Sequence, residues 1–91
     1  MEIIFLPKAD DDLEYWKQTN NTRIMKRISS LLADILEHPF TGKGKPEPLK
    51  GEQHGLWSRR ITDEHRLVYS VSSGMVYVYV YVLSLRYHYS K

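Results

Sequence analysis

The sequence predicts an α+β fold in which two N-terminal helices pack on one face of an antiparallel β-sheet. Apolar residues recur at helical spacing in the first 40 residues, whereas residues 56–83 contain three strand-like runs separated by polar turns. Ninety-one residues suffice for one hydrophobic core, so we expect a single domain over residues 1–91.

A strand and a helix are predicted at the N-terminus. The apolar run Glu2–Leu6 is typical of a short strand. Pro7 suits the first position of a helix, and the aspartates Asp10–Asp12 complement the positive end of its dipole. We therefore predict a helix over Pro7–Gln18.

The second helix has the clearest periodicity in the sequence. Asn20 and Asn21 provide a break and an N-cap, and the helix ends by His38 because Pro39 disfavours helical geometry in the preceding residue. Its apolar positions follow the spacing of one buried helical face. They are Ile24, Ile28, Leu31, Leu32, Ile35 and Leu36.

The second half of the chain is predicted to be a loop followed by three strands. Residues 39–55 hold three of the four prolines and four of the five glycines, which indicates a loop. The strands are expected over Leu56–Thr62, Arg66–Val71 and Met75–Leu83. The predicted order is therefore β-α-α-loop-β-β-β.

Side-chain alternation assigns faces to this sheet. A turn near Asp63 with an odd number of residues puts Arg60 and Arg66 on one face of the sheet and Arg59 on the apolar face. There the guanidinium group of Arg59 must extend to the edge of the sheet to reach solvent. A two-residue turn at Ser73-Gly74 adds three tyrosines to the face of Arg60 and Arg66. They are Tyr77, Tyr79 and Tyr81. Helices are then expected to cover only the other face.

The charge distribution favours an anionic partner. The net charge of +2 combines −2 in residues 1–40 with +4 in residues 41–91, where six of the seven tyrosines also lie. Basic and aromatic side chains together suit RNA, although a basic sheet with tyrosines as ordinary strand formers has the same composition.

Several classes of protein are excluded or disfavoured. No cysteine is present, which excludes disulfides and cysteine-built metal or redox sites. The four histidines are scattered without metal-ligand spacing, so we expect neither a metal nor a cofactor. The longest apolar stretch is about half of a membrane span, and no signal-peptide pattern is found. We expect a cytoplasmic protein without membrane contact.

Glu47 is the candidate general base. Two prolines flank it within residues 42–51, and three lysines surround it. The lysines are Lys43, Lys45 and Lys50. A solvated turn glutamate with lysine neighbours is the structural alternative.

Two further motifs supply cations and an acid. Residues 57–69 contain Arg59, Arg60 and Arg66, whose guanidinium groups suit either phosphate oxygens or cross-strand acidic partners, while His65 in the turn is expected to be structural. The terminal Arg-Tyr-His-Tyr contains His88, which is suited to proton transfer near neutral pH but could be incidental. One base, several cations and one acid suffice for metal-free transesterification of RNA.

Three motifs in order resemble the Txe/YoeB toxins, within the RelE/ParE superfamily of bacterial toxin–antitoxin systems. They are Gly-Lys-Gly-Lys-Pro-Glu-Pro-Leu-Lys, Trp-Ser-Arg-Arg-Ile-Thr-Asp-Glu-His-Arg-Leu-Val-Tyr and Arg-Tyr-His-Tyr. The resemblance covers nearly the whole chain and implies a microbial-RNase-like fold. It also implies ribosome-dependent cleavage of mRNA, a cognate YefM-like antitoxin and homodimers.

The resemblance implies a role for each candidate residue. Glu47 would be the general base on the ribose 2′-OH and His88 the general acid, with Arg66 stabilising the phosphate and Tyr89 orienting substrate or His88. Substrate binding is expected from Lys50 and Arg60, with further contributions from nearby basic residues. These are Arg59, Lys43 and Lys45.

One feature departs from the family pattern. Fourteen residues separate Val71 from Arg86, several more than the resemblance implies. In a tight hairpin Arg66 lies opposite Tyr81, which leaves His88 about 23 Å away unless a bulge, a wider loop or a turn of the tail shortens the distance. A relative whose site the lengthened strand has disabled therefore remains an alternative function. A ParE-like gyrase inhibitor is a second alternative, against which the Pro-Glu-Pro element and the terminal His-Tyr argue.

Overall fold

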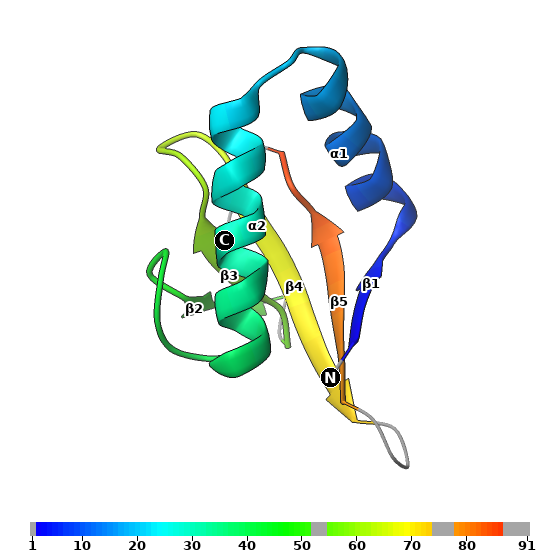
Figure 1. Ribbon diagram of the computed structural model, residues 1–91. Coiled ribbons are helices and arrows are strands. Elements are labelled where there is room, and N and C mark those ends of the chain that lie inside the picture. The colour runs from blue at the N-terminus through cyan, green and yellow to red at the C-terminus, as the bar shows by residue number, and fades with distance from the viewer. Residues whose placement is uncertain (1, 52–54, 74–77, 87–91) are drawn as a thin grey trace.

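The structure of the protein is a computed structural model that describes residues 2–51, 55–73 and 78–86 (Figure 1). These residues form β1 (Glu2–Phe5), α1 (Pro7–Gln18), α2 (Thr22–Glu37), β2 (Glu47–Pro48), β3 (Trp57–Arg60), β4 (Arg66–Ser73) and β5 (Val78–Ser84). The strands form one sheet in the order β1-β5-β4-β3-β2, and both helices lie on the same face of it (Figure 1). The predicted α+β class is confirmed.

Both helices have the predicted starts. Pro7 begins α1, and the side chain of Asn21 accepts a hydrogen bond from the Ile24 amide at 3.3 Å, which caps α2. The last turn of α2 ends before His38, as expected from Pro39. The helices that cover one face of the sheet are therefore fixed by local signals in the sequence.

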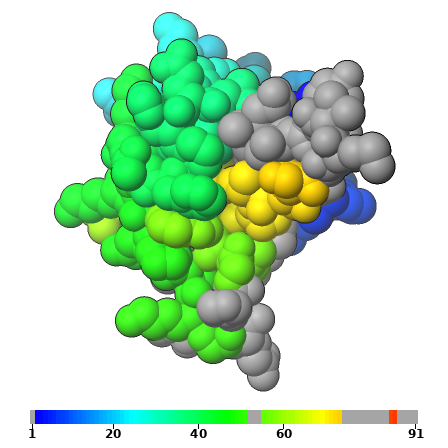
Figure 2. Space-filling model, turned by 90° about the horizontal axis from the view of Figure 1, so that it is seen from below, coloured from blue at the N-terminus to red at the C-terminus, as the bar shows by residue number. Residues whose placement is uncertain are grey.

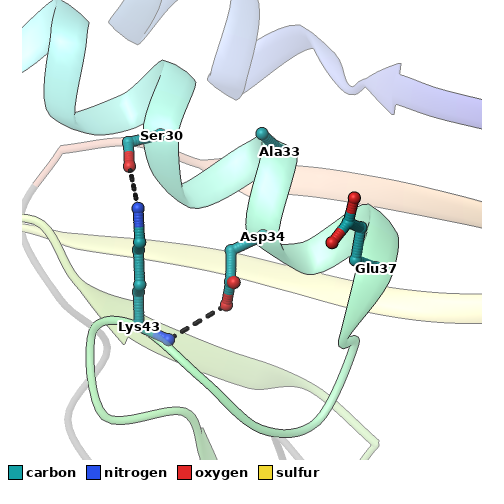
Figure 3. Close-up of a pocket in the computed structure, with 5 residues that line it drawn as sticks. All are labelled: Ser30, Ala33, Asp34, Glu37 and Lys43. Carbon is teal, nitrogen blue, oxygen red and sulfur yellow. Dashed lines mark hydrogen bonds between the residues drawn. The ribbon is translucent and has the colours of Figure 1, made fainter.

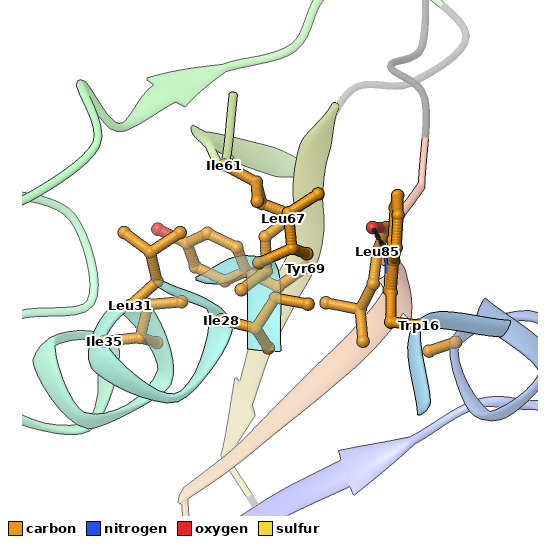
Figure 4. Packing of buried hydrophobic residues seen from close by; sticks show 10 residues of the cluster. Trp16, Ile28, Leu31, Ile35, Ile61, Leu67, Tyr69 and Leu85 are labelled. Carbon is orange, nitrogen blue, oxygen red and sulfur yellow. Dashed lines mark hydrogen bonds between the residues drawn. The ribbon is translucent and has the colours of Figure 1, made fainter. Parts of the chain in front are cut away.

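The core lies between α2 and the central strands. Ile28, Leu31 and Ile35 of α2 are at most 2% exposed. They belong to the same buried cluster as Leu67 and Tyr69 of β4, and Trp16 and Leu85 lie at its other side (Figure 4). No helix in the described part of the chain is long and apolar enough to cross a membrane.

The sheet differs from the prediction at both edges. β1 pairs with β5 in parallel, from Glu2 beside Tyr79 to Phe5 beside Val82. β2 was not predicted, because two residues inside a proline- and glycine-rich loop carry no strand periodicity. The three central strands β3, β4 and β5 are antiparallel, as expected.

The register between β3 and β4 confirms the odd-numbered turn. Residues 61–65 connect the strands, and Arg60 pairs with Arg66 while Trp57 pairs with Tyr69. Directly paired residues of antiparallel strands lie on the same face. The two arginines therefore share the face opposite the buried Tyr69.

The prediction of a tight hairpin at Ser73-Gly74 is wrong. Ser73 pairs with Val78, so the connection spans residues 74–77, and the register shifts again between Val68 and Tyr69. Val68 consequently pairs with Ser84, where a two-residue turn would have paired it with Tyr79. The shift of five residues corresponds to roughly 16 Å along the strand. Ser84, the last residue of β5, is thus brought beside Val68, two residues from Arg66.

Candidate functional site

One row of paired residues crosses the sheet on the face opposite the helices. Glu47 of β2 pairs with Ser58 of β3, which pairs with Val68 of β4. Arg60 and Arg66 form the next pair on the same face, two residues further along. From strand spacings, the Cα atom of Glu47 lies roughly 8 Å from that of Arg60 and roughly 12 Å from that of Arg66. Glu47, Arg60 and Arg66 therefore share one face of the sheet.

Glu47 is presented to solvent by a short, restrained strand. Its side chain is exposed, and backbone pairing with Ser58 fixes its position in the sheet. A further backbone hydrogen bond is made two residues later, where the amide of Leu49 donates to the carbonyl of Leu56 at 2.8 Å. In Figure 2 the green segment that carries β2 projects from the side of the molecule that faces away from α2. Glu47 is thus an exposed carboxylate on an ordered backbone.

Arg60 and Arg66 are half-buried and lie directly opposite each other. One terminal nitrogen of Arg66 donates to the carbonyl oxygens of Thr62 at 2.9 Å and Asp63 at 3.2 Å, which fixes the side chain over the turn. The Nε atom of Arg60 is buried and has no hydrogen-bond partner among the described residues. Like charges at paired positions repel, so an anion between them would be stabilising.

Lys45 and Lys50, two residues before and three residues after Glu47, are exposed. Lys43 has another environment. Its Nζ atom donates to the hydroxyl of Ser30 at 2.9 Å and its amide donates to Asp34, so it lies against α2 (Figure 3). Lys43 therefore belongs to the helix-covered side of the molecule in this structure.

The expectation that Arg59 binds substrate is wrong. Its side chain is 0% exposed, and its guanidinium group is engaged by Asp34, by Tyr69 and by backbone carbonyls. The carbonyls are those of His38, Thr41 and Lys43. Strand alternation placed Arg59 on the apolar face correctly, but a residue type that binds phosphate also forms buried ion pairs. Arg59 has no donor left for a ligand.

The pKa shifts of Asp34 and Tyr69 are consistent with an ion pair between Asp34 and Arg59. Hydrogen bonds from the Lys43 amide and from Arg59 lower the pKa of Asp34. Burial raises the pKa of the Tyr69 hydroxyl, which donates to the carbonyl of Pro39 at 2.6 Å. Asp34 is therefore ionised and Tyr69 neutral at physiological pH.

The chain leading to the C-terminal motif is anchored on α1. The carboxylate of Asp12 accepts a hydrogen bond from the Leu85 amide at 2.9 Å, and the indole N–H of Trp16 donates to the Leu85 carbonyl at 3.1 Å. Arg86 lies over the ring of Tyr15, with 4.0 Å to the centroid. The spacing of Asp12 and Trp16 puts both on one helical face, a signal that could have identified this anchor.

The catalytic assignments at the C-terminus are not tested by this geometry. His88 and Tyr89 lie outside the described residues. His65 has a packing role, since its ring meets that of Trp16 edge-on at 4.9 Å. Within the described residues, no group of three or more potential ligands could hold a metal ion.

A pocket lies on the other side of the molecule from Glu47. It is lined by Ser30, Ala33, Asp34, Glu37 and Lys43 (Figure 3). None of the predicted catalytic residues lines it. The face of the sheet opposite the helices, rather than this pocket, is therefore the candidate site.

Comparisons with known proteins agree with the fold and with the motifs. A family model described as "YoeB-like toxin of bacterial type II toxin-antitoxin system" matches residues 5–89. Toxin YoeB of Escherichia coli K12 is 47% identical over 98% of this chain and 100% of its own length.

Solved structures show the same likeness. A YoeB/ParE toxin from Agrobacterium tumefaciens is 43% identical over 98% of this chain and all of its own, with a TM-score of 0.92. A YoeB dimer from Staphylococcus aureus is 40% identical with 98% of both chains covered and a TM-score of 0.85. A heterotetrameric YoeB-YefM toxin-antitoxin complex from the same species is 41% identical, covers 96% of this chain and 95% of its own, and has a TM-score of 0.83. The chain therefore belongs to the family of YoeB-like toxins of bacterial type II toxin–antitoxin systems.

Proposed function

We propose that this toxin is a ribosome-dependent endoribonuclease that cleaves mRNA by metal-independent transesterification and so inhibits translation. Glu47 takes the proton of the ribose 2′-OH, which attacks the adjacent phosphorus. His88 protonates the departing 5′-oxygen, and Tyr89 orients the substrate or His88. The products are a 2′,3′-cyclic phosphate and a 5′-hydroxyl, so every proton and bond is accounted for without a cofactor.

The observation that carries this proposal is the sheet register. It puts one exposed carboxylate and the half-buried Arg60–Arg66 pair on the face of the sheet opposite the helices. Charge builds up on the phosphate oxygens during the attack, and guanidinium groups held nearby stabilise that charge. Arg66 has this role, assisted by Arg60 and by the exposed Lys50.

The exposure of Glu47 supports a macromolecular substrate. Glu47 is exposed on a projecting segment rather than buried in a pocket (Figure 2). An exposed carboxylate outside a pocket does little to orient flexible RNA, and correct orientation supplies a large part of a catalytic effect. The ribosome supplies this orientation when it holds mRNA in its A site, and the protein accordingly acts in the cytoplasm.

A cognate antitoxin of the YefM type is the proposed regulatory partner, and a homodimer is the proposed assembly of the free toxin. Related chains of similar length appear in a YoeB-YefM complex and as a YoeB dimer. Cross-linking and pull-down of the chain with its operon neighbour test both proposals.

The test of the activity uses ribosomes programmed with a defined mRNA. The wild-type chain should cleave the mRNA in the A site, whereas Glu47→Ala and His88→Ala should remain folded and lose cleavage by about 100-fold or more. Intact mRNA with inhibition of gyrase would instead support the ParE-like alternative. Intact mRNA with retained ribosome binding would identify a catalytically impaired relative.

A further inference from the structure

We propose that Arg59 is a positioning residue, which acts with Asp34 and Tyr69 to hold the segment that carries Glu47 in its reactive place. These three side chains are called the Arg59 cluster below. The proposal rests on the proposed function, because it gives the cluster a role in catalysis through Glu47.

All five N–H donors of Arg59 are used, and most of them hold a single stretch of backbone. One terminal nitrogen donates to Asp34 at 2.5 Å and to the Lys43 carbonyl at 3.1 Å. The other donates to the carbonyls of Thr41, at 2.8 Å, and His38. Nε donates to the Tyr69 hydroxyl at 3.2 Å. Three carbonyl groups between residues 38 and 43 thus converge on one guanidinium group.

Asp34 and Tyr69 hold the same segment independently of Arg59. The Asp34 carboxylate accepts a hydrogen bond from the Lys43 amide at 2.9 Å, and the Tyr69 hydroxyl donates to the carbonyl of Pro39. The Arg59 cluster therefore ties the loop to α2, β3 and β4 together. Loops normally satisfy their backbone with solvent, so this density of internal bonds is unusual.

A buried arginine is an expensive way to stabilise a fold. Its desolvation offsets much of the energy of an ion pair, and apolar residues of similar volume often serve stability equally well. The planar guanidinium group donates hydrogen bonds to several oxygen atoms in fixed directions, which apolar side chains cannot do. The contacts of Arg59 use this property on the loop.

Two glycines allow the loop to approach the cluster closely. Gly42 has φ +108°, and a Cβ atom there would lie 2.1 Å from Oδ2 of Asp34. Gly44 has φ +79°, and a Cβ atom there would lie 2.8 Å from Leu31 and 3.2 Å from Cβ of Arg59. The glycines that precede Glu47 in the sequence motif are therefore explained by contact with Asp34 and Arg59.

The held loop continues directly into the candidate site. The amide of Arg60 donates to the carbonyl of Gly44 at 2.7 Å, three residues before Glu47, which itself pairs with Ser58. Adjacent residues of β3 thus have complementary tasks. Arg59 points toward α2 and orders the loop, whereas Arg60 lies on the opposite face with Glu47.

The first experiment compares Tyr69→Phe with Ser30→Ala by amide hydrogen exchange. Tyr69→Phe removes one oxygen atom from the Arg59 cluster and keeps the buried ring, whereas Ser30→Ala removes only the exposed bond to the Lys43 side chain. Exchange at the amides of Lys43 and Leu49 should become about 5-fold faster or more in Tyr69→Phe and stay unchanged in Ser30→Ala. Unchanged exchange in Tyr69→Phe would overturn the proposal, whether or not the chain cleaves RNA.

The second experiment is a double-mutant cycle on single-turnover cleavage of programmed mRNA. Tyr69→Phe and Asp34→Ala should lower the rate at saturating ribosomes by about 10–100-fold without changing the apparent affinity. In a Glu47→Ala background the same changes should alter the residual rate by less than about twofold. Equal losses in both backgrounds would show that the cluster does not act through Glu47. Full cleavage by Glu47→Ala alone would instead refute the proposed function, with the exchange result still deciding whether the cluster orders the segment.

Discussion

Replacement of Asp12 by alanine tests whether α1 anchors the last described residues. The Asp12 side chain is 3% exposed and accepts hydrogen bonds from the Leu85 amide and from Lys8. Its loss leaves the buried Leu85 amide without an acceptor, which costs about 1–3 kcal/mol. The lost ion pairs with Lys8 at 3.0 Å and with Arg86 at 3.7 Å add only about 0–1 kcal/mol each.

Lys8→Ala is the matched control for this prediction. The Lys8 side chain is 50% exposed, so its removal breaks the ion pair and leaves the bond to Leu85 in place. Urea unfolding should show a lower midpoint for Asp12→Ala at unchanged slope and a nearly unchanged midpoint for Lys8→Ala. If both variants lose the same stability, the contribution attributed to the Leu85 anchor is refuted. Cleavage should also weaken in Asp12→Ala, because His88 follows Leu85 by three residues.

Three other predictions concern charge and backbone. The lowered pKa of Asp34 contributes stability that is present above its unfolded value of 3.8 and is lost as the pH falls through the folded pKa, so acid unfolding curves of Asp34→Asn should lose this component. Gly44→Ala should destabilise the protein by about 1–3 kcal/mol in thermal unfolding because of its positive φ and close contacts, whereas Gly51→Ala, with no atom within 4 Å of the added Cβ, should cost less. Sulfate should raise the Tm of the wild type more than that of Arg66→Gln, since an anion relieves repulsion between Arg60 and Arg66; equal shifts would argue against an anion site at this pair.

The helices and the register of β3 and β4 were predictable because their signals are local. Asn21 marks the start of α2 by capping it, and the spacing of apolar residues identifies its buried face. The turn at residues 61–65 sets the register through its length, which puts Arg60 and Arg66 on one face. Glu47 could be singled out because its flanking prolines are also a local signal.

Other features depend on contacts between distant segments. β2 is too short to show periodicity, and the parallel pairing of β1 with β5 has no counterpart in neighbouring residues. The pairing of Ser73 with Val78 differs from the two-residue turn favoured by Ser73-Gly74. Arg59 was assigned to the wrong role because its partners, Asp34 and the loop carbonyls, are between 16 and 25 residues away.

The most direct test of the central claim is the chemistry of the RNA ends produced on programmed ribosomes. An acid–base transesterification by Glu47 and His88 predicts upstream fragments with a 2′,3′-cyclic phosphate and downstream fragments with a 5′-hydroxyl. The rate of cleavage should be unchanged by EDTA at concentrations that leave the ribosomes intact. Intact mRNA, or fragments with a 5′-phosphate, would contradict the account.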